Sequence, residues 1–400
     1  MKKLSIEDVD ISDKKVLVRV DYNVPLKKDG NGGVQDNTRI KATLPTLRYL
    51  LEHNAKIILI SHLGRPKGKV NLQYSLKGVA YELSNLIARP VTFIDDCIGE
   101  NAFKAAANLK SGEILLLENL RFYPEEEKND PGFAQKLASL GEIFVQEAFG
   151  TVHRAHASTE GAAKYLTSVL GFLVSKEIEY MDAALSNPKR PFLAILGGAK
   201  VSDKIGVIKN LLSKVDFLVI GGGMSYTFLK SQGVNIGKSL LEAERIEEAA
   251  SILKDASERK VTIVLPVDHV IAKEISSDAE SKVTKAAEID SDFIGVDIGP
   301  MTVEKIAPIV KESKTIVWNG PMGVFEIDKF SKGTMAVVQQ VAEATSHGAI
   351  SIVGGGDSIS AIKKSGKTSE ISHISTGGGA SLEFLEGKKL PGLEALTNKE

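Results

Sequence analysis

Short runs of valine, isoleucine and leucine recur along this chain, and longer stretches rich in alanine, lysine, glutamate and leucine separate them. A short apolar run followed by a stretch with helical spacing is typical of parallel strands joined by crossover helices. The runs do not alternate apolar with polar residues, so we expect helices on both faces of each sheet. The predicted fold class is therefore α/β with doubly wound parallel sheets.

The runs fall into two sets, one in each half of the chain. A chain of 400 residues is long enough for two domains, since a typical domain has roughly 100 to 200 residues. Residues 173–185 lie between the sets, have helical spacing and end at a Ser-Asn-Pro stop signal, which predicts a helix that links two domains. The expected strands are residues 15–20, 56–60, 91–94, 114–117 and 143–145 in the first half, and residues 192–196, 217–220, 261–265, 294–296, 315–318 and 350–353 in the second.

Charge and cysteine content exclude several classes of protein. Fifty Lys and Arg residues against 51 Asp and Glu residues give a formal net charge of -1, so we expect neither a nucleic-acid partner nor a membrane partner. The single cysteine, Cys97, has no partner for an intrachain disulfide, which favours a reducing compartment. Acidic residues occupy the start of the sequence, and no apolar run approaches the roughly 18 residues of a membrane span, so we expect a cytoplasmic protein.

Cationic and polar side chains follow the expected strands of the first half. In open parallel sheets ligands bind beyond the carboxyl ends of the strands. Several guanidinium groups at one edge of a sheet predict a site for a small polyanion, because each offers a planar, permanently charged fork. The alternative is that these arginines form separate surface ion pairs. The residues are Asp21, Asn23, His62, Gly64, Arg65, Glu118, Asn119, Arg121, Thr151, His153, Arg154 and His156, to which Arg19 and Arg39 add charge.

Glycine follows the expected strands of the second half instead. Glycine at a strand-to-helix junction lets the backbone approach a ligand closely, and the following helix offers free N–H groups to phosphate oxygens. Repetition of this junction predicts a nucleotide site, with ordinary turn chemistry as the alternative at each position. The glycines lie at residues 197–198, 221–223, 295, 299, 320, 354–356 and 377–379.

Common nucleotide and metal signatures do not account for this pattern. Residues 233–239 and 365–368 only approximate a Walker motif, and no G-x-G-x-x-G follows a strand. His153 and His156 would share one helical face and bind a transition metal only if this segment were helical. Cys97 and Trp318 are interpreted as packing residues, and residues 27–37, rich in Gly and Asp, as a mobile surface turn.

Ordered motifs then point to a family. They are residues 19–25 (RVDYNVP), 61–66 (SHLGRP), 118–122 (ENLRF), 148–151 (AFGT), 153–156 (HRAH), 196–201 (LGGAKV), 203–205 (DKI), 265–268 (LPVD), 318–321 (WNGP), 323–326 (GVFE), 354–357 (GGGD) and 375–380 (STGGGA). With these motifs the chain closely resembles the phosphoglycerate kinases over essentially its whole length.

The resemblance implies an activity and a domain plan. It implies a phosphotransferase with a carboxyl group as acceptor, which moves a phosphoryl group reversibly between 1,3-bisphosphoglycerate and ADP to give 3-phosphoglycerate and ATP with Mg²⁺. It also implies a monomer that bends at a hinge beside its active-site cleft. Residues 1–170 would bind phosphoglycerate, 171–187 form the interdomain helix, 188–385 bind the nucleotide, and 386–400 return to the first domain. Both domains would be Rossmann-like.

The resemblance also implies site residues, transferred position by position. The residues that would bind the acid substrate are Asp21, Asn23, Arg39, His62, Leu63, Gly64, Arg65, Arg121 and Arg154. Those that would bind the nucleotide are Gly198, Lys200, Lys204, Gly295, Asn319, Glu326, Gly355, Gly356, Asp357 and Ser358. Arg39, Lys200, Gly356 and Gly379 would contact the transferred group, and Asp357 would be the protein ligand of Mg²⁺.

The sequence departs from the family pattern at three places. Glu147 stands where aspartate is usual, which bears on the geometry beside His153 and Arg154, and Ser358 stands where threonine is usual but keeps a hydroxyl. The turn at residues 27–37 differs in composition. Two other interpretations stay open at this point, namely a different kinase or ligase on the same two-sheet plan, and a phosphometabolite sensor without catalytic activity.

Overall fold

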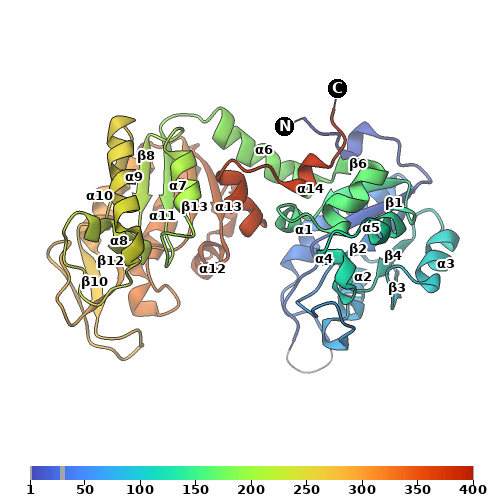
Figure 1. Ribbon diagram of the computed structural model, residues 1–400, viewed down its shortest axis with the longest axis horizontal. Helices are drawn as coiled ribbons and strands as arrows, with labels where there is room; N and C mark the ends of the chain where they lie inside the picture. The colour runs from blue at the N-terminus through green and yellow to red at the C-terminus, as the bar shows by residue number, and fades with distance from the viewer. Residues whose placement is uncertain (1, 28–31, 400) are drawn as a thin grey trace. The chain divides into compact units, whose positions relative to one another are not determined.

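The chain divides into two compact units. The computed structural model describes residues 2–27 and 32–399. Unit 1 consists of Met1–Glu179 and Lys389–Glu400, and unit 2 of Tyr180–Lys388 (Figure 1). The division falls inside helix α6 (Phe172–Ser186), the helix that the sequence predicts between the two sets of strands. The predicted α/β class, with a parallel sheet in each half, is confirmed.

Unit 1 contains a six-stranded sheet in the order β3-β4-β2-β1-β5-β6. Every neighbouring pair is parallel, as expected for strands that are connected through helices. The strands are β1 (Lys15–Val20), β2 (Lys56–Ile60), β3 (Val91–Ile94), β4 (Ile114–Leu117), β5 (Ile143–Glu147) and β6 (Thr167–Leu170). The helices are α1 (Thr38–Glu52), α2 (Lys77–Ile87), α3 (Glu100–Asn108), α4 (Pro124–Glu127), α5 (Pro131–Ala138) and α14 (Pro391–Glu394), with short turns that include η3 (Leu120–Phe122), η4 (Phe149–Thr151) and η5 (Ala157–Gly161).

The core of unit 1 fixes the carboxyl ends of its strands in one row. Side chains of β1 and β2 pack with the apolar faces of α1 and α2, and Leu47, Leu59 and Leu83 are fully buried there. Because β4, β2, β1 and β5 are consecutive in the sheet, the segments that follow these strands lie at one edge. Of the surface turn expected at residues 27–37, residues 28–31 lie outside the described residues, while Leu26 and Val34 form an antiparallel bridge.

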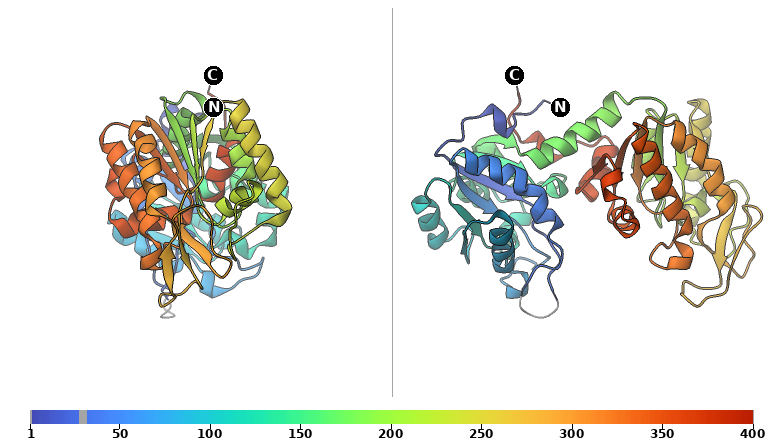
Figure 2. Two further views of the ribbon diagram at one scale, coloured as in Figure 1. Left: turned by 90° about the vertical axis from the view of Figure 1, so that its left-hand side faces the viewer. Right: turned by 180° about the vertical axis from the view of Figure 1, so that it is seen from behind.

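Unit 2 contains a second six-stranded sheet, in the order β15-β14-β13-β7-β8-β9, again with every neighbouring pair parallel. In the left view of Figure 2, α9 (yellow) lies on one side of this sheet and α10 and α11 (orange) lie on the other. The strands are β7 (Phe192–Leu196), β8 (Phe217–Ile220), β9 (Thr262–Val264), β13 (Thr315–Asn319), β14 (Ile350–Gly354) and β15 (His373–Ile374). The helices are α7 (Ile205–Leu211), α8 (Met224–Ser231), α9 (Ile246–Glu258), α10 (Pro300–Glu312), α11 (Lys332–Ser346), α12 (Gly356–Ser365) and α13 (Gly379–Leu385).

One predicted strand of the second half belongs to a different sheet. The run at residues 294–296 is part of β12 (Ile294–Ile298), which pairs antiparallel with β10 (His269–Ala272) in a three-stranded sheet completed by β11 (Ser281–Val283). An apolar run indicates a buried strand but does not determine its pairing direction, so the assignment of this run to the parallel sheet was wrong.

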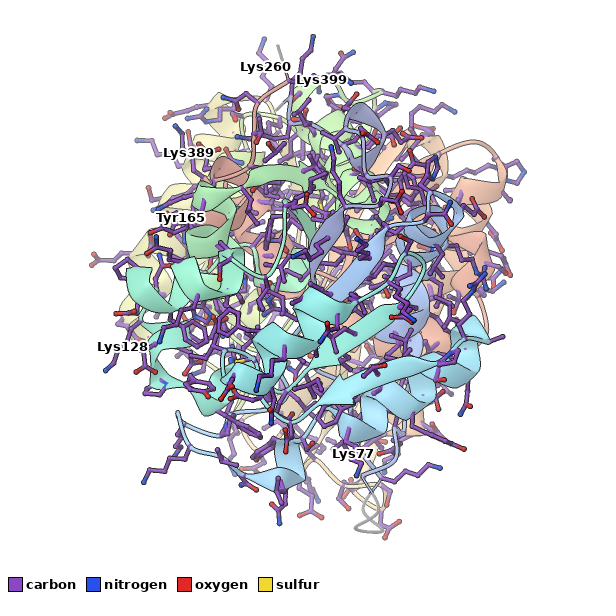
Figure 3. All side chains as sticks on the ribbon, turned by 90° about the vertical axis from the view of Figure 1, so that its right-hand side faces the viewer. Lys77, Lys128, Tyr165, Lys260, Lys389 and Lys399 are labelled. Carbon is purple, nitrogen blue, oxygen red and sulfur yellow. The ribbon has the colours of Figure 1, made fainter. Side chains whose placement is uncertain are left out.

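Charged side chains are exposed on both units. The labelled side chains in Figure 3, such as Lys128, Lys260 and Lys399, project away from the body of the protein. Trp318 and Cys97 are both buried, which confirms their interpretation as packing residues. Among the described residues, no helix is both long and apolar enough to cross a membrane.

Candidate active site

Residues after four neighbouring strands of unit 1 form a cationic cluster. Asp21 follows β1, His62 follows β2, Arg121 lies in η3 after β4, and Arg154 follows η4 after β5. Arg39, from the first turn of α1, donates from Nη1 to Asp21 Oδ2 at 2.5 Å and thereby joins the cluster. The sequence prediction that these side chains share one edge of a sheet is therefore consistent with their observed positions.

The loop after β2 is held from several sides. Asn23 Oδ1 accepts a hydrogen bond from the Gly64 amide at 2.9 Å, and Arg121 Nη1 donates to the Gly64 carbonyl at 2.9 Å. Gly64 has a φ of 62°, and a Cβ there would lie 2.3 Å from the ring of Tyr74, so only glycine fits. The side chain of Arg65, the next residue, is exposed.

Asn119 fixes the same loop from β4. Its Nδ2 donates to the carbonyls of Leu63 at 2.7 Å and Tyr74 at 2.9 Å, and its Oδ1 accepts from the amides of Leu63 and Arg121 at 3.2 and 3.1 Å. All the hydrogen-bonding capacity of this buried amide is therefore used. The main chain that follows β2 is thus fixed against the main chain that follows β4.

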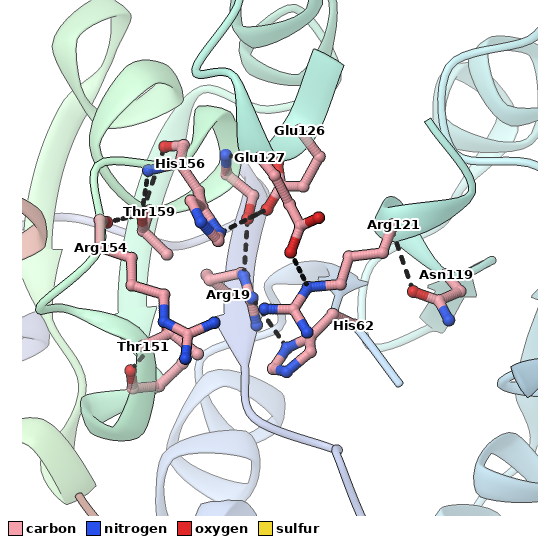
Figure 4. Close-up of polar contacts among 12 residues, drawn as sticks. Arg19, His62, Asn119, Arg121, Glu126, Glu127, Thr151, Arg154, His156 and Thr159 are labelled. Carbon is pink, nitrogen blue, oxygen red and sulfur yellow. Dashed lines mark hydrogen bonds and ion pairs between the residues drawn. The ribbon is translucent and has the colours of Figure 1, made fainter. Parts of the chain in front are cut away.

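His62 belongs to this cluster, and its ring lies beside the side chains of Arg19 and Arg121 (Figure 4). Its side chain is buried, and burial lowers its pKa well below the usual value, with further lowering by Arg19, Arg121, Arg39 and Arg154 in decreasing order. The ring is therefore neutral at physiological pH. Four permanent positive charges around a neutral hydrogen-bonding ring form an environment suited to a compact polyanion.

The two other histidines of this region do not form a metal pair. His153 and Arg154 lie in a turn and an adjoining bend, so the helical spacing that a shared metal would need is absent. Arg154 Nε instead donates to His153 Nε2 at 3.2 Å. Burial, followed by nearby arginines, lowers the pKa of His156 to about 3. Within residues 2–27 and 32–399, no group of three or more His, Cys, Asp or Glu side chains is placed to hold a metal ion.

In unit 2, Lys204 and Asn319 form a buried polar pair. Lys204 Nζ donates to Asn319 Oδ1. Burial lowers the pKa of Lys204 to about 8, although Asp203, Asp357 and Glu386 act in the opposite direction. A buried ammonium group with carboxylates nearby suits a ligand that brings negative charge.

The loop between β14 and α12 lies next to this pair. Gly355 has a φ of 89°, and a Cβ there would lie 3.2 Å from Asn319 Nδ2. Ser358 Oγ accepts from the Gly320 amide at 2.6 Å, which ties α12 to the end of β13, so the serine in place of threonine retains this hydroxyl contact. Gly356 and Asp357 form the exposed first turn of α12, where free N–H groups are available to anions.

The remaining nucleotide candidates are more dispersed within unit 2. The Gly295 amide donates to Ser239 Oγ at 2.8 Å, and a Cβ on Gly295 would lie 1.9 Å from Tyr226 Oη. Gly198 has a φ of 114°, and Gly379 begins α13. Lys200 and Glu326 are exposed, and Lys200 interacts electrostatically with Glu242.

Glu147 has a different environment from the one that its sequence position suggests. Its buried carboxyl accepts from Thr46 Oγ1 at 2.5 Å and from the Leu173 amide at 3.2 Å, at the start of α6. Burial raises its pKa to about 8, despite these hydrogen bonds. The carboxyl group of Glu147 therefore hydrogen-bonds to the first turn of α6 rather than to His153 or Arg154.

Comparisons with known proteins agree on one family. The family model described as phosphoglycerate kinase matches residues 6–388. Curated phosphoglycerate kinases include one from Moorella thermoacetica, 55% identical over 399 residues and all of both chains, and one from Elusimicrobium minutum, 56% identical with 99% of this chain and 98% of the relative covered. A solved phosphoglycerate kinase from Coxiella burnetii is similar with a TM-score of 0.90 at 42% identity, and one from Pyrococcus horikoshii with 0.81 at 34%, each over 98% of both chains.

Proposed function

The chain belongs to the phosphoglycerate kinase family, and we propose that unit 1 binds the phosphoglycerate while unit 2 binds the nucleotide. The family reaction is the glycolytic, reversible transfer of a phosphoryl group between 1,3-bisphosphoglycerate and ADP, which gives 3-phosphoglycerate and ATP. The protein is thus a phosphotransferase. The observation that supports our assignment most strongly is the cluster of four arginines around a neutral, buried histidine in unit 1.

The acid substrate is proposed to bind at the cationic edge of the first sheet. Its phosphate and carboxylate carry several negative charges, which guanidinium groups bind with paired hydrogen bonds. The loop after β2 adds main-chain groups that Asn23 and Arg121 already hold in place. The proposed contacts are Asp21, Asn23, Arg39, His62, Leu63, Gly64, Arg65, Arg121 and Arg154.

The nucleotide is proposed to bind along the glycine junctions of unit 2. Lys204 is buried beside Asn319 and would balance phosphate charge, while the first turn of α12 would donate N–H groups to phosphate oxygens. Glu326 is exposed and would accept from ribose hydroxyls. The proposed contacts are Gly198, Lys200, Lys204, Gly295, Asn319, Glu326, Gly355, Gly356, Asp357 and Ser358.

Transfer itself requires positioning and charge stabilisation rather than a covalent nucleophile. The phosphoryl group passes through a loose transition state with its charge spread over the equatorial oxygens. We propose that Arg39 and Lys200 contact these oxygens as cations, and that the amides of Gly356 and Gly379, each the first residue of a helix, add N–H donors.

Magnesium is proposed to bind mainly to the nucleotide phosphates. This ion keeps several waters and takes few protein ligands, in line with the exposed carboxylate of Asp357 beside the start of α12. When bound, it would neutralise charge on the phosphates. Chelation of magnesium should abolish turnover, and readdition of the metal should restore it.

The assignment of the two substrates to different units implies that the units approach each other during the cycle. Such closure would exclude water that could otherwise accept the phosphoryl group. We propose a monomeric, cytoplasmic enzyme that closes at a hinge, with residues 386–400 supporting closure. Small-angle scattering should show compaction when both substrates are bound, and unchanged turnover after deletion of residues 389–400 would reject the role of the tail.

The deciding experiment for activity is an assay of ATP formation from 1,3-bisphosphoglycerate and ADP. An active phosphoglycerate kinase forms ATP in this assay and runs the reverse reaction with 3-phosphoglycerate. A sensor would bind 3-phosphoglycerate without turnover, and a different kinase would require another acid. Binding of 3-phosphoglycerate to residues 180–388 rather than to the arginine cluster would contradict our assignment of the units.

A further inference from the structure

Arg19 is an unusual member of the arginine cluster because its guanidinium group is buried. The side chain lies on β1, and only 1% of the residue is exposed. Its Nη1 donates to the Val20 carbonyl, its Nε donates to Ser158 Oγ at 2.8 Å, and its Nη2 lies 3.2 Å from His62 Nδ1. Each of the three guanidinium nitrogens of Arg19 therefore bonds to a protein group. The side chain of Arg65, by contrast, is exposed.

Ser158 connects Arg19 to a buried carboxylate. Its Oγ donates to Glu126 Oε1 at 2.5 Å, and its amide donates to Oε2 at 2.9 Å. Glu126 is fully buried, and the charge of Arg19 opposes the effect of burial on the Glu126 pKa. Hydrogen bonds therefore join Glu126, Ser158, Arg19 and His62 in one continuous relay. It runs from α4 through η5 and β1 to the loop after β2.

The contact between Arg19 and His62 determines which ring nitrogen bears hydrogen. A guanidinium group has only N–H donors and no acceptor. His62 Nδ1 must therefore accept, which means that Nδ1 bears no hydrogen. The groups that face His62 are Arg19 from β1, Arg39 from α1, Arg121 from η3 and Arg154 after η4, and all of them disfavour a second proton on the ring. The only N–H of the ring is then Nε2–H.

We propose that Arg19 is a positioning residue, anchored by Ser158 and Glu126, which holds His62 as a neutral ring whose Nε2–H is donated to an anionic oxygen of the phosphoglycerate. This inference rests on the proposed role of His62 in binding the acid substrate. Arg19 itself is placed away from the substrate in this proposal, because only 1% of the residue is exposed and each of its guanidinium nitrogens bonds to a protein group. The arrangement gives a fixed donor direction without proton uptake on binding.

The first test is the tautomer of His62 in the unaltered protein. Long-range ¹H–¹⁵N spectra of the ¹⁵N-labelled chain at pH 7 report the hydrogen on each ring nitrogen, and His62→Gln identifies its signals among the 7 histidines. We expect an unprotonated Nδ1 and a protonated Nε2. A hydrogen on Nδ1, in either the other tautomer or the imidazolium, would overturn the proposal. This result does not depend on substrate binding.

The second test separates positioning from general structural damage. Ser158→Ala removes the link between Arg19 and Glu126, and Ser168→Ala is its matched control. Ser168 is also a fully buried serine of unit 1, with Oγ bonded to the Ala163 carbonyl at 2.6 Å outside the relay. Arg19→Met combined with Glu126→Gln removes both buried charges together, so neither remains unpaired.

We expect the Arg19→Met/Glu126→Gln variant to lose the fixed tautomer and to raise KM for 3-phosphoglycerate by about tenfold or more, the value of a charge-assisted hydrogen bond. Ser158→Ala should shift the His62 signals in the same direction, whereas KM for ATP and the Ser168→Ala spectrum should not change. A folded double variant with an unchanged tautomer and an unchanged KM would overturn the role of Arg19. If the tautomer is as expected but 3-phosphoglycerate does not perturb the Nε2–H signal, the proposed substrate contact of His62 fails separately.

Discussion

At the scale of single residues, Arg39 is the side chain whose loss should be most costly to turnover. It is held at 2.5 Å from Asp21 and, by our proposal, contacts the transferred phosphoryl group. Arg39→Ala should lower kcat by roughly a thousandfold, by comparison with the arginine fingers of other phosphoryl-transfer enzymes. Steady-state kinetics in both directions will measure this effect.

Arg48 provides the control for that experiment. It is an exposed arginine on the same helix, α1, so Arg48→Ala removes an equal charge without approaching the cluster. The kcat of the Arg48→Ala variant should equal that of the unaltered protein. An Arg39→Ala enzyme within tenfold of full activity would contradict the catalytic role of Arg39.

The buried carboxyl of Glu147 predicts a specific pH dependence of stability. Its pKa is raised to about 8 in the folded protein, from a usual value near 4.5. Between these values the folded state binds one more proton than the unfolded state, so the free energy of unfolding falls as pH rises. One proton corresponds to a slope of about 1.4 kcal/mol per pH unit.

Glu147→Gln should flatten that slope because glutamine does not titrate. Urea unfolding at several pH values between 5 and 8, compared between the variant and the unaltered protein, measures the difference. Asp297 also has a raised pKa, of about 7, and remains in both proteins, so the comparison isolates Glu147. Identical slopes in the two proteins would show that Glu147 is already ionised over this range.

Residue identity alone indicates much of the candidate site but not the function of each arginine. The sequence places Arg19 and Arg39 in the same cationic set, and the structure separates them by burial and bonding, since Arg19 is enclosed and Arg39 is partly exposed. Nothing in the sequence connects Glu126 or Ser158 with His62, because both residues are far from His62 in the chain and lie in short helical segments. Contacts of this kind depend on tertiary packing, and the pattern of residues at the ends of strands does not reveal it.

At the scale of elements, the junction between β14 and α12 allows a controlled test of a glycine. Gly355 has a φ of 89°, and a Cβ there would lie 3.2 Å from Asn319 Nδ2. Gly366, at the other end of α12, has a φ of 75°, and a Cβ there would meet no atom within 4 Å. Gly366→Ala should cost about 1–2 kcal/mol of stability, the usual penalty of left-handed helical backbone, whereas Gly355→Ala, where ψ is 134° and lies outside that region, should cost about 1–3 kcal/mol.

Only Gly355→Ala should also weaken nucleotide binding, because it pushes against Asn319, the partner of Lys204. Isothermal titration with ADP should give a weaker affinity for Gly355→Ala and an unchanged one for Gly366→Ala. Equal ADP affinities in the two variants would argue against a role for this junction in the nucleotide site.

Strands with a clear run of apolar residues were predictable from the sequence, whereas four others were not. β1, β2, β3, β4, β7 and β8 have the bounds that the apolar runs predict, while β6, β10, β11 and β15 were not expected. β15 has only 2 residues and all three residues of β11 are exposed, so neither has a run of apolar side chains. Strand pairing in such segments is decided by their neighbours rather than by their own composition.

At the scale of the whole molecule, residues 389–400 form part of unit 1. The Gly392 amide donates to the Val152 carbonyl at 2.8 Å, and the Thr397 amide to the Ser168 carbonyl at 2.9 Å. Leu393 is fully buried, so Leu393→Ala should destabilise unit 1 by about 2–5 kcal/mol.

Urea unfolding followed by circular dichroism will measure this loss. Emission from Trp318, the single tryptophan, reports on unit 2 separately. Leu240→Ala, at a leucine of unit 2 that is 53% exposed, is the control and should change neither signal. An unchanged unfolding curve for Leu393→Ala would mean that the tail adds little to the stability of unit 1.

The chain passes between the units twice, once within α6 and once at residues 388–389, and its two ends meet through a bridge between Lys3 and Asn398. A protease that cuts once within α6 would therefore leave the two fragments associated, because the fragment that carries unit 2 keeps residues 389–400, which stay bound to unit 1 through the Gly392 and Thr397 hydrogen bonds and the bridge between the ends. Nicked protein should migrate as one species on a sizing column and as two bands only after denaturation. Release of a free domain requires two cleavages.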